Sequence, residues 1–235
     1  MFGYVLPVRE MAVLCKRYGV PFIMDAAQSA GALPVNLEDL GADFIAMPGH
    51  KGLLGPMGTG LLLCNRLPEP LLQGGTGSLS KEQKMPDFLP DRGEAGTLNV
   101  PGIAGLRAGL AFLQKTGIDT VAQRERRQLR RCIRGLENLG YRVFAGESQS
   151  GVISFLPQGD CEELGQWLGE RNIAVRAGLH CAPLAHESAG TLDTGTVRIS
   201  FPWNACDRHT DLLLKTLEES KKIMNNYCHS RPNPL

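Results

Sequence analysis

Helical and strand-like patterns alternate through the first half of the chain. An amphipathic segment follows Pro7, and three short, mainly apolar segments come after it, at residues 20–24, 43–47 and 60–64. This alternation is typical of βα units, in which helices cover a mainly parallel sheet. We therefore predict an α/β architecture, in which a helix with one apolar face (Met11, Leu14, Cys15 and Tyr18) precedes a buried strand that ends at Asp25.

The pattern changes near residue 116. Residues 67–101 are rich in glycine, proline and polar side chains and predict a long loop, and a helix with many arginines is predicted at about 120–139. Shorter strands and helices follow, up to a last helix at 207–224, and the tail after Asn225 is expected to fray. We expect two domains: residues 1–116, part of a large α/β domain, and residues 117–235, a smaller C-terminal α+β domain.

The composition excludes several classes of function. The 25 basic and 24 acidic side chains nearly cancel, which removes the electrostatic case for a nucleic-acid binder, and the arginines of the long helix are interpreted as a solvated face. No apolar run approaches the roughly 20 residues that cross a bilayer, and the first residues lack the pattern of a signal peptide. The seven cysteines contain no CxxC pair. We expect a cytoplasmic protein with reduced thiols and no membrane partner.

Four polar residues follow the first two predicted strands. Asp25 and Gln28 come after one strand, and His50 and Lys51 come after the next. In an open parallel sheet, ligands bind beyond the carboxyl ends of the strands, so an acid and an amine would face one crevice. This arrangement suits pyridoxal phosphate (PLP): Lys51 can form a Schiff base, Asp25 can keep the pyridine nitrogen protonated, and Gln28 can bond the ring oxygen. Taken singly, a turn-forming Asp25 and a solvated Lys51 remain the simpler interpretations.

The glycines after Lys51 do not form a phosphate-binding P-loop, because the lysine precedes them. Instead, several motifs in order resemble the cysteine desulfurases of the class V aminotransferase branch of fold-type I PLP enzymes. The short Arg-x-Gly-x-His-Cys motif resembles the group shared with selenocysteine lyases. The match begins inside the large domain of that family, so the resemblance implies a chain without the N-terminal part. The motifs are Asp25-Ala26-Ala27-Gln28, Pro48-Gly49-His50-Lys51, Glu94-Ala95-Gly96-Thr97, Arg176-Ala177-Gly178-Leu179-His180-Cys181 and Val197-Arg198-Ile199-Ser200.

The resemblance implies roles for five residues that bind PLP. Lys51 would hold the cofactor covalently and move the substrate's α-proton, Asp25 would be the partner of the pyridinium, and Gln28 would bind the phenolic oxygen. His50 would help to hold the phosphate. Thr97 would reach the phosphate of the neighbouring subunit across a homodimer.

The resemblance also implies a substrate and a sulfur acceptor. Arg198 would clamp the carboxylate of the amino acid through its two-pronged guanidinium, with Arg176 as a second substrate-binding arginine. Cys181 would accept the sulfur of cysteine as a persulfide, leaving alanine, and His180 and Arg176 would supply positive charge beside it. A sulfur-acceptor protein is an expected partner. Taken alone, Arg198 would be interpreted as an ordinary arginine of an edge strand.

Three alternatives stay open at this point. The chain could be a noncatalytic remnant or dimerising module of the family. It could also keep PLP and act on another amino acid that enters through Arg198. In the third alternative, five histidine and cysteine residues, which are suitable zinc ligands but lack paired CxxC motifs, would form a metal cluster. These residues are His180, Cys181, His186, Cys206 and His209.

Overall fold

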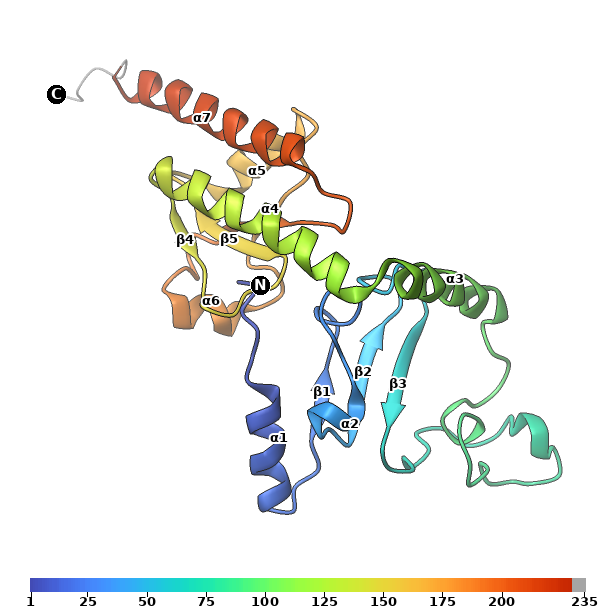
Figure 1. Cartoon of the computed structure of the whole chain (residues 1–235). Helices are drawn as coiled ribbons and strands as arrows, with labels where there is room; N and C mark the ends of the chain where they lie inside the picture. The colour runs from blue at the N-terminus through green and yellow to red at the C-terminus, as the bar shows by residue number, and fades with distance from the viewer. Residues whose placement is uncertain (230–235) are drawn as a thin grey trace. The chain divides into compact units, whose positions relative to one another are not determined.

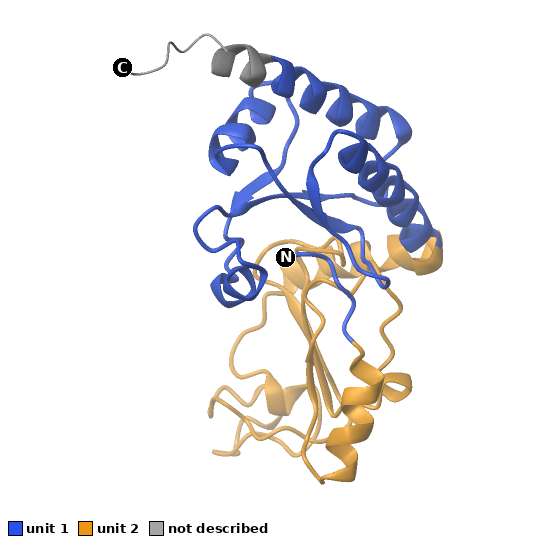
Figure 2. Ribbon diagram, turned by 90° about the vertical axis from the view of Figure 1, so that its left-hand side faces the viewer, with its two compact units in different colours: residues 1–6, 120–235 blue, residues 7–119 orange. Residues whose placement is uncertain are grey.

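The computed structural model describes residues 1–229, which form two compact units. Unit 2 comprises residues 7–119, and unit 1 comprises residues 1–6 together with the chain from residue 120 onward (Figure 2). The boundary lies at 119/120 rather than near 116, and the first six residues belong with the second half. Their backbone explains why: Val5 N donates to Ser148 O at 3.0 Å, and the Phe2 ring stacks on Phe144 with centroids 4.6 Å apart.

Unit 2 is built around a three-stranded sheet in the order β1-β2-β3 (Figure 1). β1 and β2 are parallel, as predicted, but β3 runs antiparallel to β2. The connection from β2 to β3 contains no crossover helix, and a parallel return would need one. The elements of this unit are α1 (Val8–Arg17), β1 (Ile23–Asp25), α2 (Leu37–Leu40), β2 (Phe44–Pro48), β3 (Gly60–Cys64), the 3₁₀ turns η1 (Gly77–Leu79) and η2 (Asp91–Gly93), and α3 (Val100–Thr116).

The apolar face of α1 and the strand β1 are exposed, contrary to the prediction that they are buried. Tyr18 is 71% exposed and Ile23 is 65% exposed, and Ala12 is the one residue of α1 that is buried. β1 lies at the edge of the sheet, and no described strand pairs with its outer side. The pattern correctly predicts an amphipathic helix, but burial also requires a covering surface, which the described residues do not supply.

Unit 1 contains an antiparallel sheet in the order β4-β5-β7-β6. Figure 1 labels two of its strands, β4 and β5, and the helices of this unit. The side chains of Leu136, Ile153, Phe155, Val197 and Leu217 are fully buried and form the centre of its core. The elements are α4 (Ile118–Asn138), β4 (Arg142–Phe144), β5 (Val152–Leu156), α5 (Cys161–Gly169), β6 (Arg176–Gly178), α6 (Pro183–Ala189), β7 (Thr196–Ser200) and α7 (Asp207–His229).

The last helix, α7, continues past the end predicted for it and reaches His229. The expected fraying after Asn225 falls mostly on residues 230–235, including Pro232 and Pro234, which lie outside the described residues.

The chain's longest helices carry many charged residues. Among the described helices, none combines the length and the apolar character needed to span a membrane.

The buried carboxyl group of Glu125, on α4, makes the stability of unit 1 depend on pH. Burial raises its pKa from 4.5 to about 7. The folded chain therefore keeps a proton that the unfolded chain loses, so this contribution to stability falls as pH rises from about 4.5 through about 7. We predict that Glu125→Gln removes the fall. Between pH 4.5 and pH 7, the free energy of unfolding of the variant, measured with urea, should rise by roughly 2–4 kcal/mol relative to that of the wild type. The same pH dependence in both proteins would contradict the prediction.

Candidate active site

Two turns that carry the predicted PLP-binding residues leave the same edge of the unit 2 sheet. β1 ends at Asp25, which lies opposite Ala46 in the parallel pairing with β2, and β2 ends two residues further on at Pro48. The chain therefore leaves both strands at their carboxyl ends, which confirms that the two turns are neighbours. Asp25, Gln28, His50 and Lys51 are all exposed at this edge.

The backbones of the two turns touch at a pair of glycines. A Cβ atom added to Gly31 would lie 2.0 Å from Gly52 O, and one added to Gly52 would lie 2.2 Å from Ala30 O. Gly31 also has a φ of +84°, in the region that favours glycine. No other residue fits either position without pushing the turns apart, so these glycines fix the turn after Asp25 against the turn that contains Lys51.

Asp25 combines a structural bond with an accessible carboxylate. Its Oδ1 accepts a hydrogen bond from Ala27 N at 2.8 Å, which confirms that Asp25 helps to form the turn. Ala26 N donates to Ala46 O at 2.8 Å, which holds the residue after Asp25 on the neighbouring strand. The carboxylate is thus held on an ordered backbone while its exposed side remains available to a ligand.

Lys51 lies on a loop that closes on itself. Gly49 N donates to Thr59 O at 2.7 Å, and Gly55 N donates to Gly49 O at 2.7 Å. Helix α3 packs against this loop through Gly109, where an added Cβ would lie 2.4 Å from Leu53 O. The lysine therefore extends from a backbone that is fixed on both sides, which is what a covalent attachment point requires.

We predict that Gly31→Ala weakens PLP binding at least about tenfold, because the new methyl group would separate the two turns. Gly58→Ala is the matched control. Gly58 has a φ of +75° in the loop after Lys51, and an added Cβ would meet nothing within 4 Å. Both variants carry the cost of a left-handed backbone, but only the first carries the clash. Equal PLP affinities of the two variants, measured by absorbance titration, would contradict the role of this contact.

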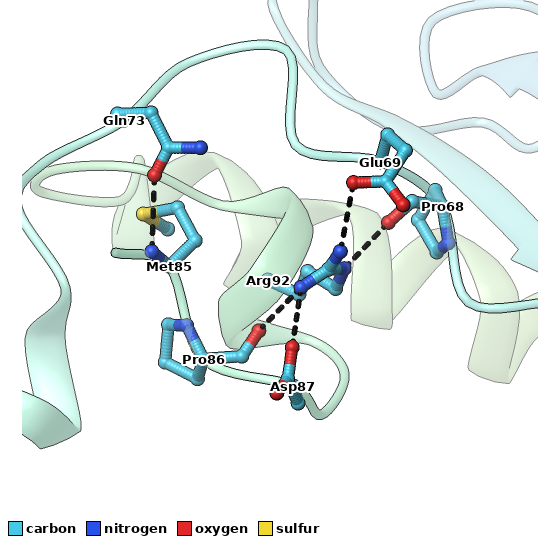
Figure 3. A network of polar contacts seen from close by, with 7 residues as sticks. All are labelled: Pro68, Glu69, Gln73, Met85, Pro86, Asp87 and Arg92. Carbon is cyan, nitrogen blue, oxygen red and sulfur yellow. Dashed lines mark hydrogen bonds and ion pairs between the residues drawn. The ribbon is translucent and has the colours of Figure 1, made fainter.

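Thr97 lies at the end of the long loop and just before α3. It is exposed, and its neighbour Gly96 donates from its backbone N to Gly75 O at 3.0 Å. Arg92 holds the preceding part of the loop together (Figure 3): its Nε donates to Pro68 O at 2.6 Å, and its guanidinium pairs with Glu69 and Asp87 at 2.9 and 2.7 Å. The Arg92 side chain is only 12% exposed. The bonds of Arg92 therefore connect distant parts of this loop to each other.

Cys181 lies on a tight turn between β6 and α6 in unit 1. His180 and Cys181 have φ angles of +53° and +59°, and Ala182 N donates to Leu179 O at 2.9 Å. Two central residues with positive φ and this bond define a type I′ turn, whose backbone favours glycine. Non-glycine residues at such positions are unfavourable and cluster at functional sites. The turn leaves the thiol exposed, with Arg176 Nη2 at 3.3 Å from Cys181 Sγ.

The two arginines predicted to bind substrate lie opposite each other on neighbouring strands. Arg176 on β6 is the partner of Arg198 on β7. β7 is an inner strand of the sheet, so Arg198 is not the arginine of an edge strand. Its buried Nε has no hydrogen-bond partner, and burial together with the Arg176 charge lowers the pKa of Arg198. Like charges placed opposite each other destabilise a sheet, so a bound anion would reduce the repulsion between the two arginines.

The structure corrects the role predicted for His180. Burial, together with the charge of Arg198, lowers the pKa of His180 to about 4, so the ring is neutral at pH 7 and supplies no positive charge to Cys181. Its Nε2 lies 3.0 Å from Thr196 Oγ1. Of the two groups expected to supply charge, only Arg176 does so.

His186 is a residue of this region whose role the sequence did not indicate. It is fully buried on α6, with Nδ1 at 2.8 Å from Thr191 Oγ1 and its ring 5.5 Å from that of His180. Its backbone N donates to the carbonyl oxygen of Ala182, the residue after Cys181, at 3.2 Å. The sequence placed His186 only in the alternative of a metal cluster, and its position five residues after Cys181 was the only available signal for a role in this region. Among the side chains that the structure describes, no three His, Cys, Asp or Glu residues gather as a metal site would require.

Comparison with known proteins decides the family. The family model described as aminotransferase class-V matches residues 1–213. The chain belongs to the class V aminotransferase family. It is 35% identical over 235 residues to a probable cysteine desulfurase of Pyrococcus abyssi, and 34% identical over 228 residues to one of Methanothermobacter thermautotrophicus. These alignments cover 95% and 92% of this chain but only 58% and 57% of the two relatives.

Solved structures of class V family members agree with the fold. The apo structure of a cysteine desulfurase from Thermococcus onnurineus NA1 matches with a TM-score of 0.86 and 34% identity, covering 94% of this chain and 57% of that one. A cysteine desulfurase from Escherichia coli with an S-sulfonic acid matches with a TM-score of 0.81 and 28% identity. The chain thus spans a little over half the length of these two curated relatives and two solved structures.

Proposed function

We propose that the chain carries the catalytic machinery of a PLP-dependent cysteine desulfurase, which removes sulfur from L-cysteine to give alanine and a persulfide. The observation that carries the proposal is the arrangement within unit 1. An exposed Cys181 is presented on a strained turn next to Arg176, and Arg176 faces Arg198, whose buried Nε has no partner. An exposed thiol and a carboxylate-binding arginine are two of the groups that this reaction requires in addition to the cofactor and its lysine.

The residues of unit 2 fit PLP. The Gly31–Gly52 contact fixes one turn bearing a carboxylate against another bearing an amine, at the edge of the sheet where ligands bind. Bound PLP acts as an electron sink for the α-carbon of an amino acid. Lys51 would attach it and carry the substrate's α-proton, and Asp25 would keep its ring nitrogen protonated. Gln28 would bond its phenolic oxygen.

His50 and Thr97 complete the proposed cofactor site. His50, next to the attachment lysine, would hold the phosphate within the same chain. Thr97 would reach the phosphate bound by a second copy, so we propose a homodimer as the working form. The pinned loop that precedes Thr97 suits this role, because a residue that reaches out of its own chain needs a fixed base.

Residues of unit 1 would bind the carboxylate of the substrate and accept its sulfur. Arg198 would bind the α-carboxylate with its planar guanidinium, and Arg176 would add a second positive charge. The Cys181 thiolate would attack the substrate sulfur. A sulfur–sulfur bond forms, the carbon–sulfur bond breaks with its electron pair staying on carbon, and a proton completes alanine. The persulfide left on Cys181 would pass to a thiol of an acceptor protein.

The test is product analysis with the purified chain and added PLP. We expect alanine and, in the presence of a reducing thiol, sulfide in equal amounts from L-cysteine, with much slower turnover of other amino acids. Absence of both PLP absorbance and turnover would favour the noncatalytic remnant or dimerising module, and PLP binding without turnover of any amino acid would equally contradict desulfurase activity. Turnover of a different amino acid through Arg198 would favour the second alternative, and each of these results would overturn the proposal.

A further inference from the structure

A cavity of about 560 Å³ lies in unit 1 between the beginning of α4 and the segment that joins β7 to α7. The residues that line it and matter here are Arg124, Arg127, Gln128, Trp203, Asp207 and Arg208. None of these residues has a role in the function proposed above. The volume lies in the range of pockets that hold small molecules, about 300–1,000 Å³.

The floor of the cavity is an ordered polar network. Gln128 is only 3% exposed, its Nε2 donates to Asp207 Oδ1 at 2.8 Å, and its Oε1 accepts from Thr210 Oγ1 at 2.7 Å. Arg127 Nη2 donates to Asp207 Oδ2 at 2.7 Å. Both carboxylate oxygens of Asp207 are thus engaged, and the bonds from Gln128 and Arg127 lower its pKa. Asp207 orients Arg127 and is not available to a cation from outside.

The cavity carries an uncompensated positive charge. Its lining contains three arginines and one carboxylate, which is paired with Arg127. Within residues 1–229, neither Arg124 nor Arg208 has a carboxylate partner. Arg208 lies in the first turn of α7, where the helix dipole disfavours a cation. An anion would relieve both the mutual repulsion of the arginines and this unfavourable placement, whereas a cation or a neutral ligand would relieve neither.

We propose that this cavity is a binding site for a small dianion, either a phosphate group or a dicarboxylate, held between Arg124 and Arg208 over the network of Gln128 and Asp207. Guanidinium groups bind both kinds of anion through paired N–H donors. The small volume and the near-zero net charge of the chain distinguish this site from a surface for nucleic acid.

Trp203 in the lining provides a local readout. The chain has one other tryptophan, Trp167 on α5, whose ring packs under Arg171 at 3.7 Å. We expect titration of the full chain with inorganic phosphate, at constant ionic strength set by chloride, to change the fluorescence of Trp203 and to saturate. Trp203→Phe should remove the signal. A parallel titration with malonate shows whether a dicarboxylate binds in place of phosphate.

The arginine variants decide the proposal. Arg124→Gln with Arg208→Gln should weaken binding of the effective anion roughly 100-fold, because each substitution removes a charged donor. Arg130→Gln with Arg134→Gln is the matched control: both residues are exposed on α4, outside the cavity lining, and their loss should change the affinity less than about threefold. No saturable response to either anion, or equal weakening in the two double variants, would overturn the site. These results do not depend on PLP or on desulfurase activity.

Discussion

Lys51→Ala abolishes the visible absorbance of added PLP and lowers alanine production from cysteine by about 1,000-fold or more, if the proposed function is right. The lysine would both attach the cofactor and carry the substrate's α-proton, and groups that act as a unit in this way show losses of this size. The loop that carries Lys51 is closed by backbone bonds from Gly49 and Gly55, so a shorter side chain at the exposed position 51 should leave the fold intact.

Lys84→Ala is the matched control for this prediction. Lys84 is an exposed lysine of the same unit and belongs to the long loop, not to either turn of the cofactor site. The control should keep the absorbance and the activity of the wild type. Retained absorbance and alanine formation in the Lys51 variant would show that another group holds the cofactor. That result would also contradict the roles proposed for Asp25 and Gln28.

Cys181→Ser should lower sulfide release from cysteine by about 1,000-fold or more while leaving PLP binding unchanged. A hydroxyl is a far weaker nucleophile than a thiolate toward sulfur, and the substitution keeps the size of the side chain on the strained turn. Mass spectrometry of the wild type after one turnover should find one additional sulfur on the peptide that contains Cys181.

Cys206→Ser is the control for the thiol, because Cys206 is the other exposed cysteine among those that the structure describes. It should retain full sulfide release. A persulfide on Cys206, or undiminished sulfide release from the Cys181 variant, would contradict the proposed acceptor. Because PLP absorbance is measured on the same samples, failure of cofactor binding can be distinguished from failure of sulfur transfer.

The sequence predicted correctly what depends on local patterns and on motif order. The alternation of elements and the positions of Asp25 and Lys51 after neighbouring parallel strands follow from residues close together in the chain. So does the long helix at the start of unit 1, which is observed as Ile118–Asn138. The family resemblance was carried by motifs that span most of the chain, and the match to residues 1–213 confirms it.

The errors concern properties that depend on residues distant in sequence. The protonation of His180 is set by its burial and by Arg198, eighteen residues later, so its spacing to Cys181 alone suggested the wrong charge. The edge-strand interpretation that Arg198 would receive if taken alone fails because β6 pairs beyond β7, which the pattern of β7 does not reveal. The exposure of Tyr18 and Ile23 depends on whether another surface covers them, and amphipathicity carries no information about that.

The central claim is that Lys51 is the attachment point of PLP, and one measurement tests it most directly. The purified chain is incubated with PLP, reduced with borohydride to make the attachment permanent, digested and analysed by mass spectrometry. The account predicts a phosphopyridoxyl group on the peptide that contains Lys51, and its loss when excess cysteine is added before reduction. A label on a different lysine, or a label spread over exposed lysines such as Lys81 and Lys84, would contradict the account.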